Sequence, residues 1–510
     1  MSGEPLPPVK RVVIVGGGTA GWMTAAALSR LTDAGVAVTL IESEEIGTVG
    51  VGEATIPSLL DFNRYLGIDE DAFMAATGAT FKLGIEFVDW ADRGDRYLHP
   101  FGIHGRDVHG VKFHQIWLRQ SRLAGRMGQV GNVSDYCLAN QAAASGRFTR
   151  PVPDPAAVLS SFSYAFHFDA SLYARFLRGL AEEAGVQRIE GKIVHVDIAS
   201  DDGCIRAVEL ADGRRAEGEL FIDCSGFRSL LLGDALGVPF TSWQHWLPCD
   251  RAVAVPSAST SAPLPYTRAT ADSAGWRWRI PLQHRVGNGH VYASAFIDDD
   301  EATAKILDNL DAPPLDAPRP LRFTAGVRER LWERNCIAIG LAGGFLEPLE
   351  STSIHLIQSG ITRLMSLFPD TGPAIAERKE YNRLLRQEYE QVRDFVILHY
   401  HRTNRTDSDF WNYCRTMAIP TTLEDKIALW RAKGRIIRDQ GGLFSDDSWI
   451  AVLMGQGLIP QSHDPLADAL PIEEAGRFLD HLRDVIARTA AAMPRHIDFI
   501  ASHCRSDLAA

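Results

Sequence analysis

The apolar pattern near the start of the chain changes period twice. The run RVVIV at residues 11–15 predicts a strand, helical spacing follows over about residues 20–32, and a second strand is expected over residues 38–42. A helix over residues 170–184 and short strands over residues 189–223 continue the alternation. Strand, helix and parallel strand in this order predict a doubly wound α/β domain.

The pattern changes again in the middle and at the end of the chain. Residues 239–323 alternate between apolar and polar positions and contain several prolines, which is typical of a mainly β lobe, whereas the spacing becomes helical from about residue 367. We therefore expect a core of residues 1–366, with a β-rich lobe from about residues 80–165 and 239–323, and a helical C-terminal region of residues 367–510.

One alternating segment carries a lysine. In ATFKLGIEFVDW, residues 79–90, the predicted strand places Lys82, Gly84 and Glu86 on the face opposite to the apolar side chains. That apolar face consists of Phe81, Leu83, Ile85 and Phe87. Lys82 is then either an exposed lysine held in an ion pair or a cation that points into a cavity.

Length, composition and net charge limit the number of domains and the classes of binding partner. A chain of 510 residues exceeds one compact core, and 45% hydrophobic with 23% charged residues is ordinary for a globular protein. The formal net charge of −12 argues against nucleic acid or an anionic membrane as the main partner. Scattered cysteines without a CxxC pair, no signal peptide and no apolar run of about 18 residues favour a cytoplasmic protein outside the membrane.

The first glycine turn predicts a dinucleotide site. VVIVGGGTAGW contains G-x-G-x-x-G between the first strand and the first helix, and an acidic residue ends the second strand. Glycines let backbone N–H groups approach a pyrophosphate, and a carboxylate accepts from ribose hydroxyls. The expected contacts are Gly16, Gly18, Thr19, Ala20, Gly21 and Glu42. Two distant segments, FIDCSG at residues 221–226 and CIAIGLAGG at residues 336–344, resemble further cofactor contacts and favour extended FAD over NAD.

Two other stretches suggest chemistry beside that cofactor. EPLESTSIHLIQSG, residues 347–360, places three hydroxyl residues at a predicted helix start, which is either a capped end or an anion site. GWRWRIPL places Trp276, Trp278 and Ile280 on one strand face, as core packing or as a wall that keeps a competing ligand from the flavin.

These motifs together resemble the flavin-dependent halogenases of the tryptophan halogenase family, along nearly the whole chain. The motifs are GGGTAG (16–21), GVGEAT (50–55), FKLGIEFVDW (81–90), HPFG (99–102), WxWxIP (276–281) and EPLEST (347–352). The resemblance implies a glutathione-reductase-like FAD-binding monooxygenase fold, with a β-rich substrate lobe and a helical C-terminal region that covers the substrate site.

The resemblance also implies a mechanism. Reduced FAD from a separate flavin reductase reacts with O2, and chloride or bromide is oxidised to hypohalous acid. This acid passes through an internal tunnel to Lys82, which delivers electrophilic halogen to a small aromatic substrate. Glu350 assists the lysine or takes the proton lost from the ring. No metal is expected, and a homodimer is common in similar proteins.

Further site residues follow from the same resemblance. Halide would be held by the backbone N–H groups of Thr352 and Ser353, and the substrate ring would lie between His99 and Phe101. Trp276 and Trp278 would shield the flavin. The remaining flavin contacts would be Gly52, Glu53, Ala54, Leu341 and Ile354.

Two departures from the family pattern bear on specificity. Ser353 replaces the usual glycine of the halide turn, where a positive φ would be unfavourable, so halide preference is expected to shift. The paired tyrosines and glutamate that hold free tryptophan are absent, and the corresponding region offers Phe444 and Trp449 as ring contacts. Indole or another electron-rich aromatic is therefore the expected substrate. A flavin-dependent hydroxylase and a non-catalytic flavin-binding protein remain as alternatives.

Overall fold

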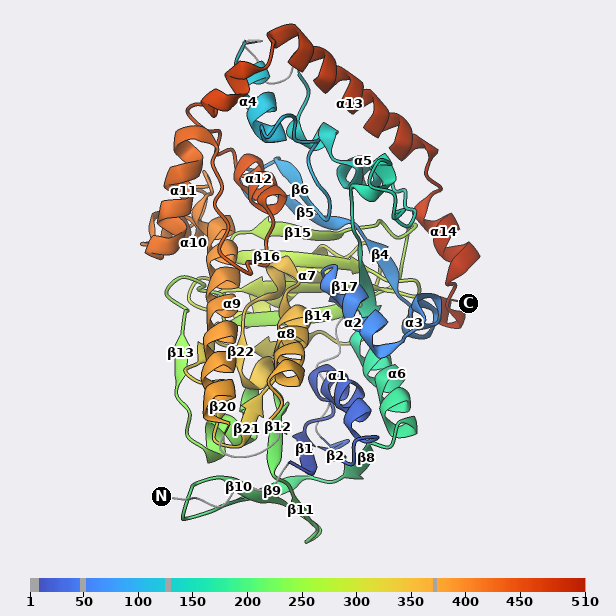
Figure 1. Cartoon of the computed structure of the whole chain (residues 1–510), viewed down its shortest axis with the longest axis vertical. Helices are drawn as coiled ribbons and strands as arrows, with labels where there is room; N and C mark the ends of the chain where they lie inside the picture. The colour runs from blue at the N-terminus through green and yellow to red at the C-terminus, as the bar shows by residue number, and fades with distance from the viewer. Residues whose placement is uncertain (1–8, 46–51, 124–129, 370–373, 510) are drawn as a thin grey trace. The chain divides into compact units, whose positions relative to one another are not determined.

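The computed structural model describes residues 9–45, 52–123, 130–369 and 374–509 (Figure 1). The chain divides into two compact units, each built from three segments. The first unit comprises Met1–Thr77, Phe168–Asp250 and Arg322–Glu390. The second unit comprises Gly78–His167, Arg251–Leu321 and Gln391–Ala510. Most of the helical C-terminal region thus belongs to the same unit as the β-rich segments.

The first unit is organised around a six-stranded sheet of order β20-β21-β12-β1-β2-β8. β1 pairs in parallel with β2 and β12, and four of its five residues are buried, as expected for a central parallel strand. Helix α1 packs against α6 and α8 (Figure 1). This arrangement confirms the doubly wound start that the sequence predicts.

The helices of the first unit are α1 (Thr19–Leu28), α2 (Ser58–Leu66), α3 (Glu70–Thr77), α6 (Ala170–Glu183) and α8 (Ser353–Ser366). The strands of its large sheet are β1 (Arg11–Val15), β2 (Ala37–Glu42), β8 (Gln187–Glu190), β12 (Leu220–Asp223), β20 (Trp332–Glu333) and β21 (Cys336–Ala338). Its other strands are β3 (Gly52–Ala54), β9 (Ile193–Ile198), β10 (Ile205–Leu210), β11 (Arg215–Glu217), β13 (Phe240–Ser242), β19 (Gly326–Arg328) and β22 (Gly344–Phe345).

The second unit contains a seven-stranded sheet of order β18-β14-β17-β16-β15-β5-β6. These strands are β5 (Gly84–Val88), β6 (Arg96–Pro100), β14 (Arg251–Ser257), β15 (Thr267–Asp272), β16 (Gly275–Pro281), β17 (Val286–Tyr292) and β18 (Arg319–Arg322). Two further strands are β4 (Thr80–Lys82) and β7 (Ala165–Asp169). Its helices are α4 (Phe113–Leu123), α5 (Leu138–Ala144), α7 (Asp299–Asp308), α10 (Asp409–Thr416), α11 (Thr421–Lys433), α12 (Asp446–Gly455), α13 (Ile472–Ala492) and α14 (His496–His503).

The structure corrects one expectation about the lysine-bearing segment. It is not a single strand with one polar face, because the chain breaks at Leu83 and its two halves pair with different neighbours. β4 pairs with β7, whereas β5 pairs with β15 and β6. Lys82, Gly84 and Glu86 are buried like the apolar residues between them. The alternation of apolar and polar residues in this segment therefore does not separate a buried face from an exposed face, because both faces lie in the interior.

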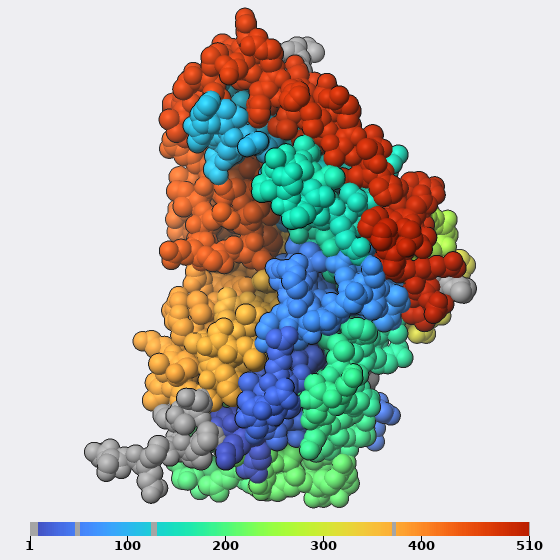
Figure 2. Space-filling view, turned by 45° about the vertical axis from the view of Figure 1, so that its right-hand side comes forward, coloured from blue at the N-terminus to red at the C-terminus, as the bar shows by residue number. Residues whose placement is uncertain are grey.

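The C-terminal part is helical, as predicted. Helix α9 (Ile375–His401) is 27 residues long, and α13 runs along α4 and α5, as the red and cyan segments of Figure 2 show. Within the described residues, no helix combines the length and the apolar character that crossing a membrane requires. The seven cysteines all lie within the described residues, and none of them forms a disulfide bond.

Candidate functional site

The glycine turn between β1 and α1 has the shape that a pyrophosphate needs. Gly16 has φ +111°, and a Cβ there would lie 2.3 Å from the Cys224 carbonyl oxygen. A Cβ on Gly21 would lie 1.8 Å from the Gly16 carbonyl oxygen, so neither position accepts a side chain. A Cβ on Gly18, at the start of α1, would meet nothing within 4 Å. The two outer glycines permit close packing, and Gly18 leaves open space at the helix N-terminus.

Glu42 ends β2, as predicted, and lies against this turn. Its Oε1 accepts from Arg188 Nε at 2.5 Å, and its Oε2 accepts from Trp22 Nε1 at 3.2 Å. A Cβ on Gly17 would lie 1.5 Å from Glu42 Oε2, so the middle glycine is also required. Each carboxylate oxygen keeps a further lone pair for a ribose hydroxyl. No motif in the sequence indicated Arg188, which lies on β8.

The GVGEAT motif lies partly outside the described residues, since only Gly52–Ala54 and the following Thr55 are placed. Gly52 and Ala54 are buried, and Glu53 between them is half-buried. Burial and, secondarily, the charge of Asp169 raise the pKa of Glu53 to about 7. Asp169 itself caps α6 by accepting from the N–H groups of Ser171 and Leu172. Glu53 therefore changes charge near neutral pH.

The EPLEST segment turns sharply before α8. Pro348–Glu350 form a short 3-10 helix, Ser351 adopts a left-handed conformation with φ 58°, and α8 begins at Ser353. The positive φ that would be unfavourable for a serine therefore does not occur at Ser353. Ser353 has a helical backbone, which serine adopts without strain, and the left-handed residue lies two positions earlier. The serine in place of the usual glycine does not distort this turn.

Thr352 is the residue best placed to bind an anion. It occupies the N-cap position of α8 with 0% exposure, but its side chain caps no backbone N–H. Its buried Oγ1 has no hydrogen-bond partner among the described residues. The first N–H groups of a helix lack intrahelical acceptors and carry favourable partial charge for an anion. Glu350, 1% exposed, lies in the preceding turn, Ile354 is buried in the first turn of α8, and Leu341 is half-buried in the short 3-10 helix Gly340–Ala342.

In the second unit, Lys82 is buried with 0% exposure, which excludes the interpretation of an exposed lysine. It is the last residue of β4, and its Nζ lies 5.1 Å from the centroid of the Phe101 ring. This distance is within the range of a cation–π interaction, which strengthens when the cation is desolvated. The predicted substrate contact Phe101 is thus already next to the predicted catalytic lysine.

The other predicted ring contacts gather around a residue that the sequence did not reveal. His99, Phe444 and Trp449 all pack on Phe395 of α9, with ring centroids 5.7, 3.7 and 4.9 Å away respectively. Phe444 stacks parallel to Phe395, and Trp449 meets it edge-on at 84°. Phe395 has no motif around it. Only its position on the buried stripe of a long amphipathic helix could have indicated it.

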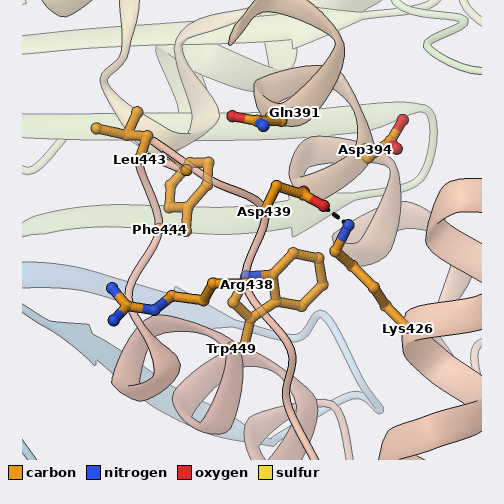
Figure 3. A pocket seen from close by; sticks show the side chains of 9 residues that line it. Gln391, Asp394, Lys426, Arg438, Asp439, Leu443, Phe444 and Trp449 are labelled. Atoms are coloured by element: carbon orange, nitrogen blue, oxygen red, sulfur yellow. Dashed lines mark hydrogen bonds and ion pairs between the residues drawn. The ribbon is translucent and has the colours of Figure 1, made fainter. Parts of the chain in front are cut away.

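A pocket opens beside this aromatic cluster (Figure 3). Phe444 and Trp449 form part of its wall, and Lys426, Asp439 and Asp394 contribute charge. Lys426 Nζ lies 2.8 Å from Asp439 Oδ2, the ion pair drawn in Figure 3, and 5.9 Å from the Trp449 ring centroid. The pocket therefore combines an aromatic wall with a charged rim.

The other charges of that rim are also paired within the second unit. Asp394 accepts from Arg393 at 2.7 Å and from the Thr422 hydroxyl at 2.5 Å. Arg438 lies 3.0 Å from Asp446. A ligand with a full charge would have to compete with these partners, whereas a neutral aromatic group would not.

The two tryptophans of WxWxIP lie on β16 as predicted, with buried residues alternating along the strand up to Ile280. Their ring centroids are 6.1 Å apart. Trp278 packs on the bare backbone of Gly289, where a Cβ would lie 2.0 Å from the ring, and its buried Nε1 has no partner among the described residues. Both rings are interior side chains of the second unit, and their role as a flavin shield stays a prediction.

The predicted residues thus divide between the units. The glycine turn, Glu42, Glu350, Thr352 and Ser353 belong to the first unit. Lys82, the ring contacts and the tryptophan pair belong to the second.

A nucleotide-binding sheet with this turn fits FAD, and comparison with known proteins establishes the class: the protein is a flavin-dependent halogenase. More particularly, the chain belongs to the tryptophan halogenase family, whose sequence profile matches residues 11–472. It is 36% identical over 520 residues to the tryptophan 6-halogenase SttH of Streptomyces toxytricini. The alignment covers 96% of this chain and 98% of that protein.

Solved structures agree with the family assignment and confirm the expected fold class. Xcc4156, a flavin-dependent halogenase from Xanthomonas campestris, is 50% identical with a TM-score of 0.93, over 98% of this chain and 99% of its own. BrvH, a flavin-dependent halogenase from Brevundimonas sp. BAL3, is 48% identical with a TM-score of 0.92, over 97% and 99%.

Proposed function

We propose that the enzyme uses reduced FAD, O2 and chloride or bromide to halogenate an electron-rich aromatic such as indole, with delivery through Lys82. Reduced FAD, O2, halide and one proton give FAD, hypohalous acid and water. The acid and the arene then give the halogenated arene and water. A separate flavin reductase supplies the reduced FAD. The complete burial of Lys82 beside Phe101 is the observation that carries this proposal.

The first unit holds the cofactor and the halide. When bound, the reduced flavin would supply two electrons and the halide two more, so that one oxygen atom of O2 becomes water and the other becomes the oxygen of hypohalous acid. The N–H groups at the start of α1 bind its pyrophosphate, and Glu42 accepts from its ribose. The first N–H groups of α8, those of Thr352 and Ser353, donate to halide, and the buried Thr352 Oγ1 offers a hydroxyl donor to the same anion.

Lys82 and Glu350 perform the transfer to carbon. Lys82 Nζ donates a hydrogen bond to the oxygen of hypohalous acid, which makes its halogen more electrophilic. The electron pair of the ring carbon attacks the halogen, and the halogen–oxygen bond breaks. The oxygen takes a proton from Lys82 and leaves as water, Glu350 takes the ring proton, and exchange with solvent returns both side chains to their starting charge. A buried lysine makes this donation stronger than a solvated one does, because no water competes for it.

The second unit selects the substrate. His99 and Phe101 hold the ring next to Lys82, and the cluster around Phe395 extends that apolar surface. The relatives named tryptophan halogenases act on tryptophan, but the charged groups of the pocket here already have partners within the second unit. This supports a neutral aromatic substrate over a zwitterionic amino acid.

The test is bromination of indole by the enzyme with FAD, a flavin reductase, NADH, O2 and bromide. We expect bromoindole by mass, and Lys82→Met should abolish it while FAD binding persists. The conservative change His109→Asn, in a surface loop, serves as the control. Hydroxylated indole as the only product would contradict the proposal and would support the alternative, a flavin-dependent hydroxylase. Free tryptophan, assayed in parallel, should react more slowly than indole.

A further inference from the structure

The short strand that carries Lys82 is held by more than its strand partner. β4 has only three residues, and in the second unit it pairs with β7 in the register Thr80↔His167, Phe81↔Phe166 and Lys82↔Ala165. A ladder this short fixes the strand weakly, because few backbone hydrogen bonds resist its displacement. The side chains around β4 supply two further attachments, each through a buried histidine.

The first attachment runs through His167 of β7. The Thr80 hydroxyl donates to the Pro281 carbonyl at 2.7 Å, so its oxygen accepts from His167 Nδ1 at 2.9 Å. His167 Nε2, left without a proton, then accepts from the Thr267 hydroxyl at 3.0 Å. The chain of bonds joins β4 to the proline that ends the WxWxIP motif and to β15. It also requires one neutral tautomer of His167.

The second attachment runs through His496, the first residue of α14. The backbone N–H of Phe81 donates to His496 Nε2 at 3.1 Å, and His496 Nδ1 donates to the Pro263 carbonyl at 2.8 Å. This arrangement again uses the neutral tautomer with the proton on Nδ1. The Phe81 ring stacks on Phe148 at 4.0 Å and meets Phe499 of α14 edge-on at 5.5 Å, so the helix also packs against the strand.

Both histidines stay uncharged beside the lysine. His167 is 0% exposed and His496 is 1% exposed. Burial, with the nearby charge of Lys82, lowers the pKa of His167 far below its usual range, and burial lowers the pKa of His496 to about 4. Neither ring therefore repels the Lys82 cation at neutral pH, and each uses both nitrogens in hydrogen bonds.

We propose that His167 and His496 are positioning residues, which fix β4 from both sides and hold Lys82 Nζ where it transfers halogen to the substrate. This inference rests on the proposed role of Lys82. A displacement of about 1 Å at a reacting group can cost about 100-fold in rate. Loss of either attachment should therefore let hypohalous acid escape before it reacts with the ring.

The experiment measures how the oxidant is divided between two products. The holoenzyme, with reductase, NADH, O2 and bromide, is given indole, and escaped hypobromous acid is trapped by a β-diketone in solution. His167→Leu and His496→Leu should raise the ratio of trapped oxidant to bromoindole by between about tenfold and about 100-fold. The total of both products per NADH should stay within about twofold, because halide oxidation uses residues of the first unit.

Conservative variants make the test specific and keep it informative if a leucine variant does not fold. His167→Asn can still donate to Thr80, and His496→Gln can still accept from the Phe81 N–H. Both should restore a ratio close to that of the parent enzyme. His290→Leu is the matched control, since His290 is a buried histidine of the same unit that bonds to the Ala302 carbonyl and not to β4. Its ratio should not change.

The outcomes separate this inference from the proposed function. If Lys82→Met raises the ratio but the folded histidine variants do not, the positioning role is wrong. It is also wrong if both products fall together, in step with the loss of folded enzyme, or if His290→Leu shifts the ratio equally. If Lys82→Met itself leaves the ratio unchanged, the role of Lys82 in the proposed function fails as well.

Discussion

His496 accepts a hydrogen bond from the backbone N–H of Phe81 across 415 positions of sequence. Phe81 immediately precedes Lys82, so the last helix of the chain is attached directly to the strand that carries the predicted catalytic lysine. The C-terminal region and the β-rich segments belong to one unit, in which α12 also packs on β6 and α13 on α4 and α5.

The same contact predicts an acid-sensitive stability. His496 has a pKa lowered from 6.5 to about 4, so between these values the unfolded chain binds a proton that the folded protein excludes. The free energy of unfolding should therefore increase as the pH rises from about 4 to 6.5. As the pH falls through the same range, the protein should lose up to about 3 kcal/mol of stability because of this group. Urea transitions at pH 7 and pH 5 measure it. His496→Gln should show a smaller difference, and an equal difference would contradict the assignment.

Phe395 should control substrate affinity. Phe395→Leu keeps most of the buried volume but removes the stacked contact to Phe444 and the edge-on contact to Trp449. An aromatic pair contributes about 1 kcal/mol beyond area burial, so KM for indole should rise roughly fivefold to tenfold with a smaller change in kcat. Phe410→Leu is the control, because Phe410 is equally buried in α10 and packs on Trp411. An equal KM effect in the control would refute the assignment.

The turn before α8 should tolerate change at Ser353 and not at Ser351. Ser351 has φ 58°, which a β-branched residue adopts only at a cost of about 2 kcal/mol, so Ser351→Val should lower stability and raise KM for bromide. Ser353→Gly should cost about 1 kcal/mol or less and leave KM for bromide within about twofold, because the helical backbone gains nothing from glycine. Steady-state kinetics at varied bromide, with thermal unfolding alongside, distinguish the two.

Two neighbouring glycines of the nucleotide turn should behave differently when replaced. Gly17→Ala brings a methyl group against the Glu42 carboxylate and should weaken both the apo protein and its affinity for FAD. Gly18→Ala meets no protein atom, so the apo melting temperature should be unchanged while FAD affinity falls by about tenfold or more. Melting with and without FAD tests this. Unchanged FAD affinity in Gly18→Ala would contradict placement of the pyrophosphate at this turn.

Local patterns were enough to predict much of the first unit. The strand Arg11–Val15, the carboxylate at the end of β2 and the helix over residues 170–183 follow from short windows. In each of these short segments, the spacing of the apolar residues predicts the same secondary structure as the local turn and capping residues do. The alternation of Trp276, Trp278 and Ile280 on β16 was equally local. The motifs also predicted the family, because they contain the residues that a halogenase needs for its turns and for its chemistry.

Other features depended on contacts between distant segments. Sequence periodicity cannot tell a half-exposed strand from one covered on both faces, so the break at Leu83 and the burial of Lys82 were decided by tertiary packing. The roles of His167, His496 and Phe395 had the same origin, since a buried polar or aromatic side chain is defined by its partners. The sequence by itself determined which local elements form and which chemistry the chain carries. Only the tertiary structure decided how Lys82 is held, because hydrogen-bond partners for a three-residue strand must come from elsewhere in the fold.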